Sequence, residues 1–285
     1  MIPSTIKINA VAESNMNFNA VARHLTDTQN WHKWWPGQRT FQYNRTDFRL
    51  DKIKLNSFEL KLFFKNDSIK NFLQLIPLND NKTGFSWGCE FESSKNPFKR
   101  WLQYFDAISI KKMLQVITDS LGKYGDKVEN VYGFRVEKVK VADSVLISTR
   151  AIFNHYPADK EIDSMIQQLK KYISSQQAVE KNYPMLNVHR NGANDYEAMV
   201  AIATERLLPA DKDFSPKLVL KGGNILEAEF RGGPAAVKKA FADFENYRAD
   251  FNITSPAIPY QLLITDRVKE ADTTKWVTKF YYPIF

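Results

Sequence analysis

The sequence has a single cysteine, Cys89, among its 285 residues. One thiol excludes a disulfide framework within the chain and any zinc site built on several thiolates. The four histidines show neither H-x-x-x-H nor H-E-x-x-H spacing, so the sequence indicates no catalytic metal. It also has no phosphate-binding G-x-x-x-x-G-K-[ST] loop, no dinucleotide-binding G-x-G-x-x-G turn and no G-x-S-x-G nucleophile elbow. We therefore expect no metal, no cofactor and no catalytic residues of these classes.

Long hydrophobic runs are also missing, since no stretch approaches the ~18 apolar residues of a membrane-spanning helix. Apolar residues make up 44% of the chain and charged residues 25%, which is typical of a globular protein. The net charge is +8, and +6 of it falls in residues 1–130. Scattered basic residues favour a solvated surface, and attraction to an anionic membrane or nucleic acid is the alternative. We expect a soluble, cytoplasmic protein.

The first half has the pattern of a sheet that grips one long helix. Residues 5–11 alternate apolar and polar side chains, as in a strand with one buried face, and residues 18–25 have helical spacing. After Asn96-Pro97, apolar residues recur at helical spacing from Trp101 to Leu121. Four β-like runs lie between these helices, at 48–55, 58–64, 69–76 and 84–91. The layout predicts an α+β domain.

Three motifs in this half resemble the SRPBCC (START-like, polyketide-cyclase-like) superfamily over residues 1–128. They are Trp31-x-x-Trp34-Trp35-Pro36, the strand Thr83–Trp87 and the segment that leads into the long helix, Asn96-Pro97-Phe98-x-Arg100. The resemblance implies a helix-grip fold whose cavity often holds an apolar ligand; short, Lys- and Asn-rich middle strands leave both an open and a collapsed cavity as alternatives. Many relatives have a membrane-spanning helix before a segment like Ile2-Pro3-Ser4. The resemblance therefore also implies, as an alternative, the soluble domain of a protein anchored through a segment absent from this chain.

Tryptophans are prominent in this half. Large aromatic side chains usually pack in cores, where each buries ~150–250 Å². We expect core packing for the cluster Trp31, Trp34 and Trp35, and also for Trp87 and Trp101.

The second half contains an internal duplication. An F-x-x-x-P frame occurs at Phe153–Pro157 and again at Phe230–Pro234. Each copy follows a β-like run, precedes an amphipathic helix and leads through a proline turn into two more strands. The sequence therefore predicts two β-α-β-β units that form a sheet with pseudo-twofold symmetry.

This duplicated pattern resembles the gyrase-inhibitor-like (SOUL-like) effector-binding domain found in many bacterial transcription activators, over residues 131–285. The closing aromatic strand Lys275–Ile284, the strand Tyr260–Asp266 and the turn Arg231–Pro234 carry the resemblance. It implies a cleft across the pseudo-twofold that is lined by aromatic residues and binds small, often lipophilic molecules. Cation-binding members have a carboxylate near the start of the penultimate strand, where this chain has Gln261. The resemblance therefore implies a non-cationic ligand here.

We expect the ligand-binding residues to come from both repeats. Alternation in the last strand places Trp276 and Tyr281 on opposite faces, so that only one of them can line the cleft. Pseudo-symmetry places Tyr183 and Met185 on the wall opposite Tyr260 and Gln261, whereas Glu227 is expected at the surface. The expected ligand-binding residues are Tyr156, Tyr183, Met185, Tyr260, Gln261, Trp276 and Tyr281.

Apolar walls with few polar groups favour ligand capture over chemistry. We therefore expect a non-enzymatic protein that binds or senses a small lipophilic molecule. The alternative is a hydrolase or cyclase that acts on a small hydrophobic substrate. The sequence shows no helix-turn-helix, so no direct binding to nucleic acid is expected.

Overall fold

The computed structural model describes residues 3–65, 67–192 and 194–285 and divides into two compact units, 1–133 and 134–285. Ile2 of the segment Ile2-Pro3-Ser4 lies outside the described residues. In the part of the chain that is described, no helix combines the length and the apolar composition needed to cross a bilayer.

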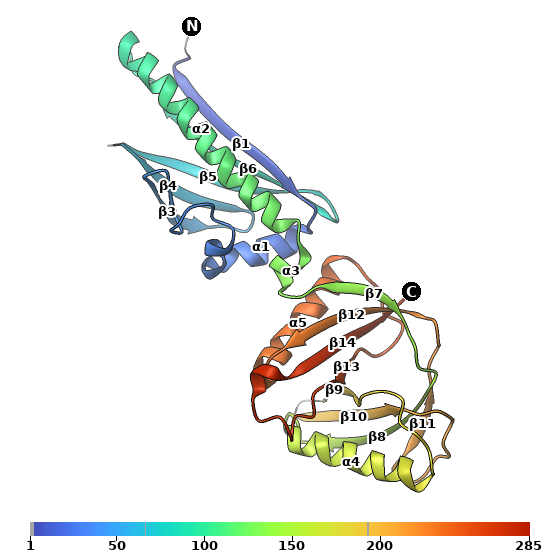
Figure 1. Ribbon diagram of the computed structural model, residues 1–285. Coiled ribbons are helices and arrows are strands. Elements are labelled where there is room, and N and C mark those ends of the chain that lie inside the picture. The colour runs from blue at the N-terminus through green and yellow to red at the C-terminus, as the bar shows by residue number, and fades with distance from the viewer. Residues whose placement is uncertain (1–2, 66, 193) are drawn as a thin grey trace. The chain divides into compact units, whose positions relative to one another are not determined.

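A six-stranded antiparallel sheet and one long helix form the first unit (Figure 1). The sheet has the strand order β1-β6-β5-β4-β3-β2. In chain order the elements are β1 (Thr5–Ser14), α1 (Phe18–Thr26), the 3-10 helix η1 (Thr28–Lys33), β2 (Gln42–Tyr43), β3 (Thr46–Ile53), β4 (Ser57–Phe64), β5 (Asp67–Asn79), β6 (Lys82–Glu92), α2 (Pro97–Gly125) and α3 (Val128–Tyr132). This confirms the predicted order of strand, helix, meander and long helix.

The residues at the ends of α2 determine where it starts and how it packs. Asn96 caps it, because its Oδ1 accepts hydrogen bonds from the backbone N–H groups of Phe98 and Lys99 at 3.0 and 3.3 Å. Pro97 occupies the first helical turn, where no N–H is needed. Near the other end, a Cβ at Gly122 would lie 2.8 Å from the Glu13 carbonyl oxygen of β1. Glycine therefore allows α2 to pack directly on β1.

Aromatic side chains fill the interior of this unit. Trp31, Trp34 and Trp35 are buried and contact one another, with ring centroids 5.0–6.3 Å apart. The Trp87 ring meets Trp35 edge-on, and its Nε1 donates to Asn71 Oδ1 at 2.7 Å. The expected core role of these four residues is confirmed. Trp101 is the exception: it lies on α2 with 57% of its surface exposed, so the prediction of core packing is wrong there.

The second unit is one curled, eight-stranded antiparallel sheet with the order β11-β8-β10-β9-β13-β14-β12-β7. The sheet consists of two four-stranded halves, β11-β8-β10-β9 and β13-β14-β12-β7, which meet where β9 pairs with β13. Its elements are β7 (Val136–Lys140), β8 (Val145–Phe153), α4 (Asp159–Ser175), β9 (Met185–Asn191), β10 (Asp195–Ala203), β11 (Ser215–Leu218), β12 (Asn224–Arg231), α5 (Pro234–Asp250), β13 (Tyr260–Leu263), the 3-10 helix η2 (Thr273–Lys275) and β14 (Val277–Ile284). Both predicted β-α-β-β units are present.

Each half also includes an edge strand from the other repeat. β7 precedes the first repeat but pairs with β12 of the second, and β11 precedes the second but pairs with β8 of the first. These two short strands were not predicted, because their pairing depends on partners far away in the sequence.

Both helices of the second unit cover the same face of its sheet. α4 packs on β8 and β10, and α5 packs on β12 and β14 (Figure 1). Strand alternation sends Ile147, Leu186 and Val200 into the layer beneath α4. Their sequence neighbours Leu146, Met185 and Ala201 belong to a separate apolar cluster on the opposite, concave face.

His24 is a buried histidine in the first unit. Its ring lies 5.2 Å from that of Tyr124, and its Nε2 has no hydrogen-bond partner among the described residues. Burial, assisted by the positive charge of Lys33, lowers the pKa of His24 to about 4. The imidazole is therefore neutral in the folded protein at neutral pH.

We predict that the first unit loses stability as pH falls from about 6.5 to about 4. In that interval the unfolded chain binds a proton at His24, near its ordinary pKa of about 6.5, whereas the folded chain does not. The shift corresponds to about 3 kcal/mol in the free energy of unfolding. Replacement His24→Phe should flatten this part of the pH profile, measured by urea unfolding with tryptophan emission. An unchanged slope would contradict the assignment.

Candidate functional site

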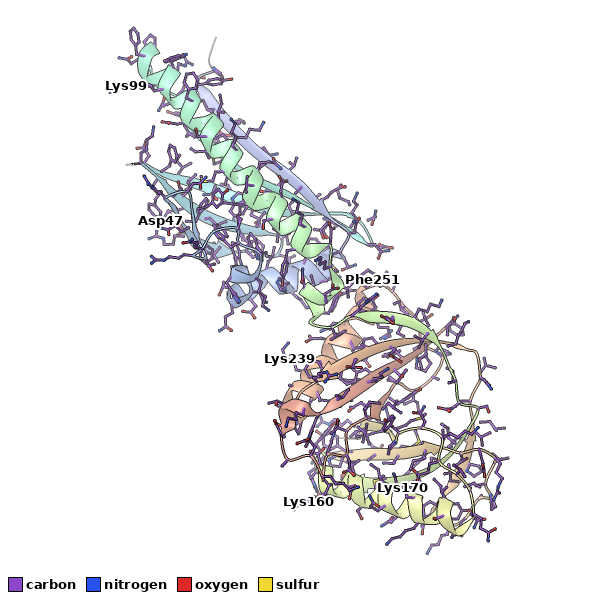
Figure 2. All side chains as sticks on the ribbon, in the orientation of Figure 1. Asp47, Lys99, Lys160, Lys170, Lys239 and Phe251 are labelled. Carbon is purple, nitrogen blue, oxygen red and sulfur yellow. The ribbon has the colours of Figure 1, made fainter. Side chains whose placement is uncertain are left out.

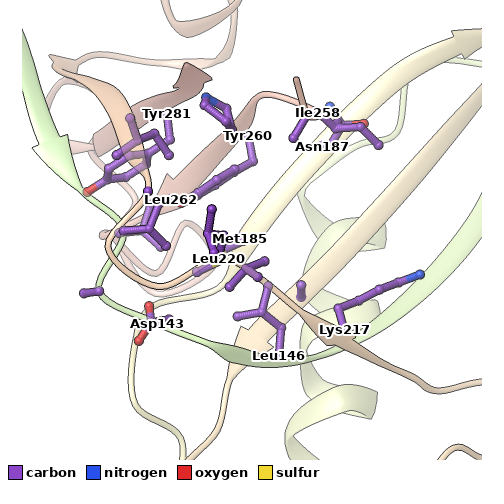
Figure 3. Close-up of a pocket in the computed structure, with 18 of the residues that line it drawn as sticks. Asp143, Leu146, Met185, Asn187, Lys217, Leu220, Ile258, Tyr260, Leu262 and Tyr281 are labelled. Atoms are coloured by element: carbon purple, nitrogen blue, oxygen red, sulfur yellow. The ribbon is translucent and has the colours of Figure 1, made fainter. Parts of the chain in front are cut away.

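A cavity of about 730 Å³ occupies the concave face of the second unit (Figure 3). Its floor comes from strands of both repeats, through Leu146, Met185, Ala201 and Leu262. Tyr260 and Tyr281 extend the wall, with their rings stacked at 5.1 Å. Since α4 and α5 both lie on the other face, neither of these two helices of the second unit covers this apolar surface.

Two linkers border the cavity and hold the sheet in its curl. One joins β7 to β8 through residues 141–144, and the other joins β11 to β12 through residues 219–223. They pair with each other: the Val141 N–H donates to the Gly223 carbonyl at 2.9 Å, and the Gly222 N–H donates to the Val141 carbonyl at 2.8 Å. Gly222 has φ +81°, a left-handed conformation that glycine adopts readily. The linkers thereby keep the two ends of the sheet close together.

The rim of the cavity is apolar and open to solvent. Three exposed side chains line it: Leu218 at the end of β11, Leu220 on the second linker and Ile258 in the loop before β13. Exposed apolar residues that gather in one patch mark interaction sites, ligand-binding grooves among them.

One carboxylate on the wall, Glu227 of β12, has two partners on β14. Its Oε1 accepts from Lys279 Nζ at 2.7 Å, and its Oε2 accepts a short hydrogen bond from the Tyr281 hydroxyl. The bond to Glu227 raises the pKa of Lys279, and burial followed by the same bond raises the pKa of Tyr281. Lys279 is thus an ammonium, and Tyr281 a neutral donor, at physiological pH. The expected surface position of Glu227 is wrong, because β12 alternation turns it toward the cavity.

Other polar groups on the wall are also bonded within the protein. Asp143 Oδ2 accepts from Asn182 Nδ2 at 2.8 Å, and Asn187 Nδ2 donates to the Pro259 carbonyl at 2.8 Å. Lys140 Nζ donates to Asn224 Oδ1 at 2.8 Å. The polar part of the wall is therefore largely satisfied without a ligand.

The structure brings three of the seven expected ligand-binding residues together. Met185, Tyr260 and Tyr281 line the cavity (Figure 3). Tyr183 lies instead on a separate hollow of about 210 Å³ beside α4. Tyr156 contacts Tyr196 edge-on, with Lys238 Nζ 5.2 Å from its ring centroid, and does not line the cavity.

Gln261 and Trp276 face away from the cavity. Tyr260 and Gln261 are consecutive in β13, so they must point to opposite faces. Gln261 lies opposite Leu186 and Phe280 in the register, in the layer that the helices cover. Trp276 precedes β14; its Nε1 donates to the Glu270 carbonyl at 2.8 Å, and the Arg267 guanidinium lies over its ring. Met185 was expected on the wall opposite Gln261, but in the register Met185 lies opposite Leu262 and shares its face, whereas Gln261 lies opposite Leu186 on the other face.

No protein-family model matches the chain, and no curated protein matches it. Among solved structures, the EcmrR C-terminal domain matches with TM-score 0.46 and 9% identity, covering 53% of this chain and 98% of that one. SAV2435 bound to tetraphenylphosphonium matches with TM-score 0.34 and 14% identity, covering 53% and 94%. A hydrolase from Listeria innocua matches with TM-score 0.40 and 10% identity, covering 53% and 92%.

A further match corrects one expectation. The EcmrR–DNA complex matches with TM-score 0.47 and 12% identity, covering 66% of this chain and 70% of that one. A helix-turn-helix is one of several ways to dock on DNA, and a chain of net charge +8 attracts phosphates at long range. The expectation of no direct nucleic-acid binding is therefore withdrawn.

We predict that Gln261→Glu destabilises the second unit without changing the chemistry of the cavity. The new carboxylate would be buried between Leu186 and Phe280. The free energy of unfolding should fall by about 1–3 kcal/mol at neutral pH, and the loss should be smaller in acid, where the carboxyl group is protonated. Chemical unfolding measures it, with Gln261→Met as the uncharged control of similar size. Unchanged stability together with new binding of a cationic dye would place Gln261 in the cavity.

Proposed function

We propose that the second unit binds a small, lipophilic, non-cationic molecule in its cavity and acts as a ligand-binding or sensing module. The observation that carries the proposal is the concave face, which has an apolar floor and is covered by neither α4 nor α5. A volume of about 730 Å³ is within the range of small-molecule sites. Burial of a ligand's apolar surface there would supply the binding energy.

The preference for a non-cationic ligand rests on Glu227 and no longer on Gln261. A cation would have to compete with Lys279 for the Glu227 carboxylate, which also accepts from Tyr281. Lys140, Arg150 and Lys217 also line the wall, together with one further carboxylate, Asp143, so the cationic side chains there outnumber the carboxylates. The Tyr281 hydroxyl already donates to Glu227 and the Asn187 amide to the Pro259 carbonyl, so apolar contact is the main source of affinity for a neutral ligand.

The alternative of a hydrolase or cyclase would require one of the carboxylates on the cavity wall, Asp143 or Glu227, to act as a base. Asp143 accepts a hydrogen bond from Asn182, and both oxygens of Glu227 already accept hydrogen bonds, from Lys279 and from Tyr281. Of the residues that the structure describes, the cavity wall includes neither a histidine nor a cysteine. Capture of a ligand is therefore better supported than chemistry on it.

We further propose that the two units are separate domains, an SRPBCC-like domain followed by a gyrase-inhibitor-like domain. The SRPBCC-like fold of the first unit is supported by its sheet order β1-β6-β5-β4-β3-β2 and by the packing of α2 on β1. Support for the second comes from the duplicated order of strands and helices.

We predict that Ala201→Phe blocks the cavity. Ala201 lies on the floor, where a phenyl group would occupy the space of the ligand. Titration with the neutral dye Nile red should show an affinity loss of about tenfold or more, because less apolar surface of the dye can be buried in the cavity. Ile152→Phe is the matched control, because Ile152 is an exposed residue of β8 outside the cavity wall. No binding by the wild-type protein would overturn the proposal.

We also predict that Lys279→Met converts the cavity into a site for cations. The change removes the ammonium that neutralises Glu227. Tetraphenylphosphonium and tetraphenylborate have nearly the same shape and opposite charge, so the ratio of their affinities isolates the electrostatic effect. That ratio should rise by about tenfold or more relative to wild type in a titration by calorimetry. Lys217→Met removes a lysine that lines the wall but leaves Lys279 on Glu227, and it should change the ratio less. An equal change would refute the role of Lys279.

A further inference from the structure

The first three turns of α2 carry an apolar stripe on their outer side. Its side chains lie at helical spacing and are exposed, with Phe98 at 82% and Trp101 at 57%. Figure 2 shows side chains projecting from this end of the helix, around the labelled Lys99. We call this surface the α2 stripe; it consists of Phe98, Trp101, Leu102, Phe105 and Ile108.

The stripe is distinct from the face with which α2 packs on the sheet. Further along the helix, Ile110, Leu114 and Ile117 are buried. On a helical wheel, at about 100° per residue, Phe105 lies roughly opposite Leu114. The core of the first unit therefore lies against the side of α2 that includes Leu114, and the residues of the α2 stripe are exposed on the other side. Trp101 and Phe105 form the centre of the α2 stripe, where their rings meet edge-on with centroids 4.7 Å apart.

Positive charge borders the stripe at both ends. Lys95, Lys99 and Arg100 lie at its start, and Lys111 and Lys112 at its finish. The acidic residue within this stretch is Asp106, whose Oδ1 accepts from Lys65 Nζ at 2.6 Å. The surface is thus apolar in the middle and cationic at its ends.

We propose that the α2 stripe docks on the surface of an anionic phospholipid bilayer. A helix with an exposed apolar face that includes Trp and Phe, bordered by Lys and Arg, lies in the membrane interface, where the rings enter the acyl boundary and the cations meet lipid phosphates. The long lysine side chains can reach the headgroups while the apolar residues are buried.

Charge and shape favour lipid over two other partners. A second copy of the chain would bring two cationic helices together, and like charges oppose that pairing. A single-stranded nucleic acid would meet the same charges, but it binds by stacking bases on rings along a groove. Leu102 and Ile108 in the stripe have no ring, and the stripe is the convex side of a helix. This inference is independent of the function proposed for the second unit.

The tryptophan content makes the docking directly measurable. Trp101 is exposed, whereas the other five tryptophans are at most 5% exposed. We would add vesicles of phosphatidylcholine alone, or of an equimolar mixture with phosphatidylglycerol, to the full chain. With the anionic mixture we expect co-flotation, a blue shift of the emission and quenching by lipids brominated in the acyl chain. Phosphatidylcholine alone, or high salt, should weaken all three effects.

Variants distinguish binding through the α2 stripe from non-specific binding to vesicles. Leu102→Ser/Phe105→Ser should lower vesicle partitioning by about tenfold or more, because two apolar side chains no longer enter the interface. Lys111→Gln/Lys112→Gln should reduce binding to the anionic vesicles and leave binding to phosphatidylcholine vesicles unchanged. The matched control is Leu55→Ser, which changes an exposed leucine (90%) outside the stripe and should leave partitioning unchanged.

Three results would overturn the proposal. The first is failure to float with anionic vesicles, or equal flotation of the Leu102→Ser/Phe105→Ser variant. The second is a blue shift that grows with protein concentration without lipid, which would identify a second copy as the partner. The third is a shift with a single-stranded oligonucleotide and none with vesicles.

Discussion

The second unit depends on one constraint, which is that both helices cover the same face of a curled sheet. The sheet is joined at its centre by a short pairing of β13 with β9, where Leu262 lies opposite Met185. Strand alternation then divides every strand between a helix-covered core and a concave face. The paired linkers at Val141 and Gly223 hold the sheet ends close together, so this face encloses a cavity instead of forming an open surface.

The same alternation determines the chemistry of the cavity. It turns Glu227 and Tyr281 inward and places their partner Lys279 beside them. The three groups satisfy one another, which leaves apolar surface as the main resource for binding. The polar groups of the wall therefore act on selectivity between ligands more than on total affinity.

The order of elements could be predicted from the sequence, because apolar periodicity and the repeated F-x-x-x-P frame are local signals. Prediction failed where a side chain's environment depends on distant pairing. Gln261 was expected in the cavity, but β13 begins with Tyr260 facing it, and the next residue must face the helices. Trp101 has the helical spacing of its buried neighbours, yet it lies on the outer side of α2. β7 and β11 are short strands, and each pairs with the other repeat.

Extraction of the purified wild-type protein, followed by mass spectrometry of the released small molecules, tests the central claim most directly. If the concave face is a ligand cavity, a neutral, largely apolar compound should be recovered in proportion to the protein, and adding it back to the stripped protein should raise the unfolding temperature of the second unit. Recovery of nothing, with no thermal shift across a library of lipophilic compounds, would contradict the account.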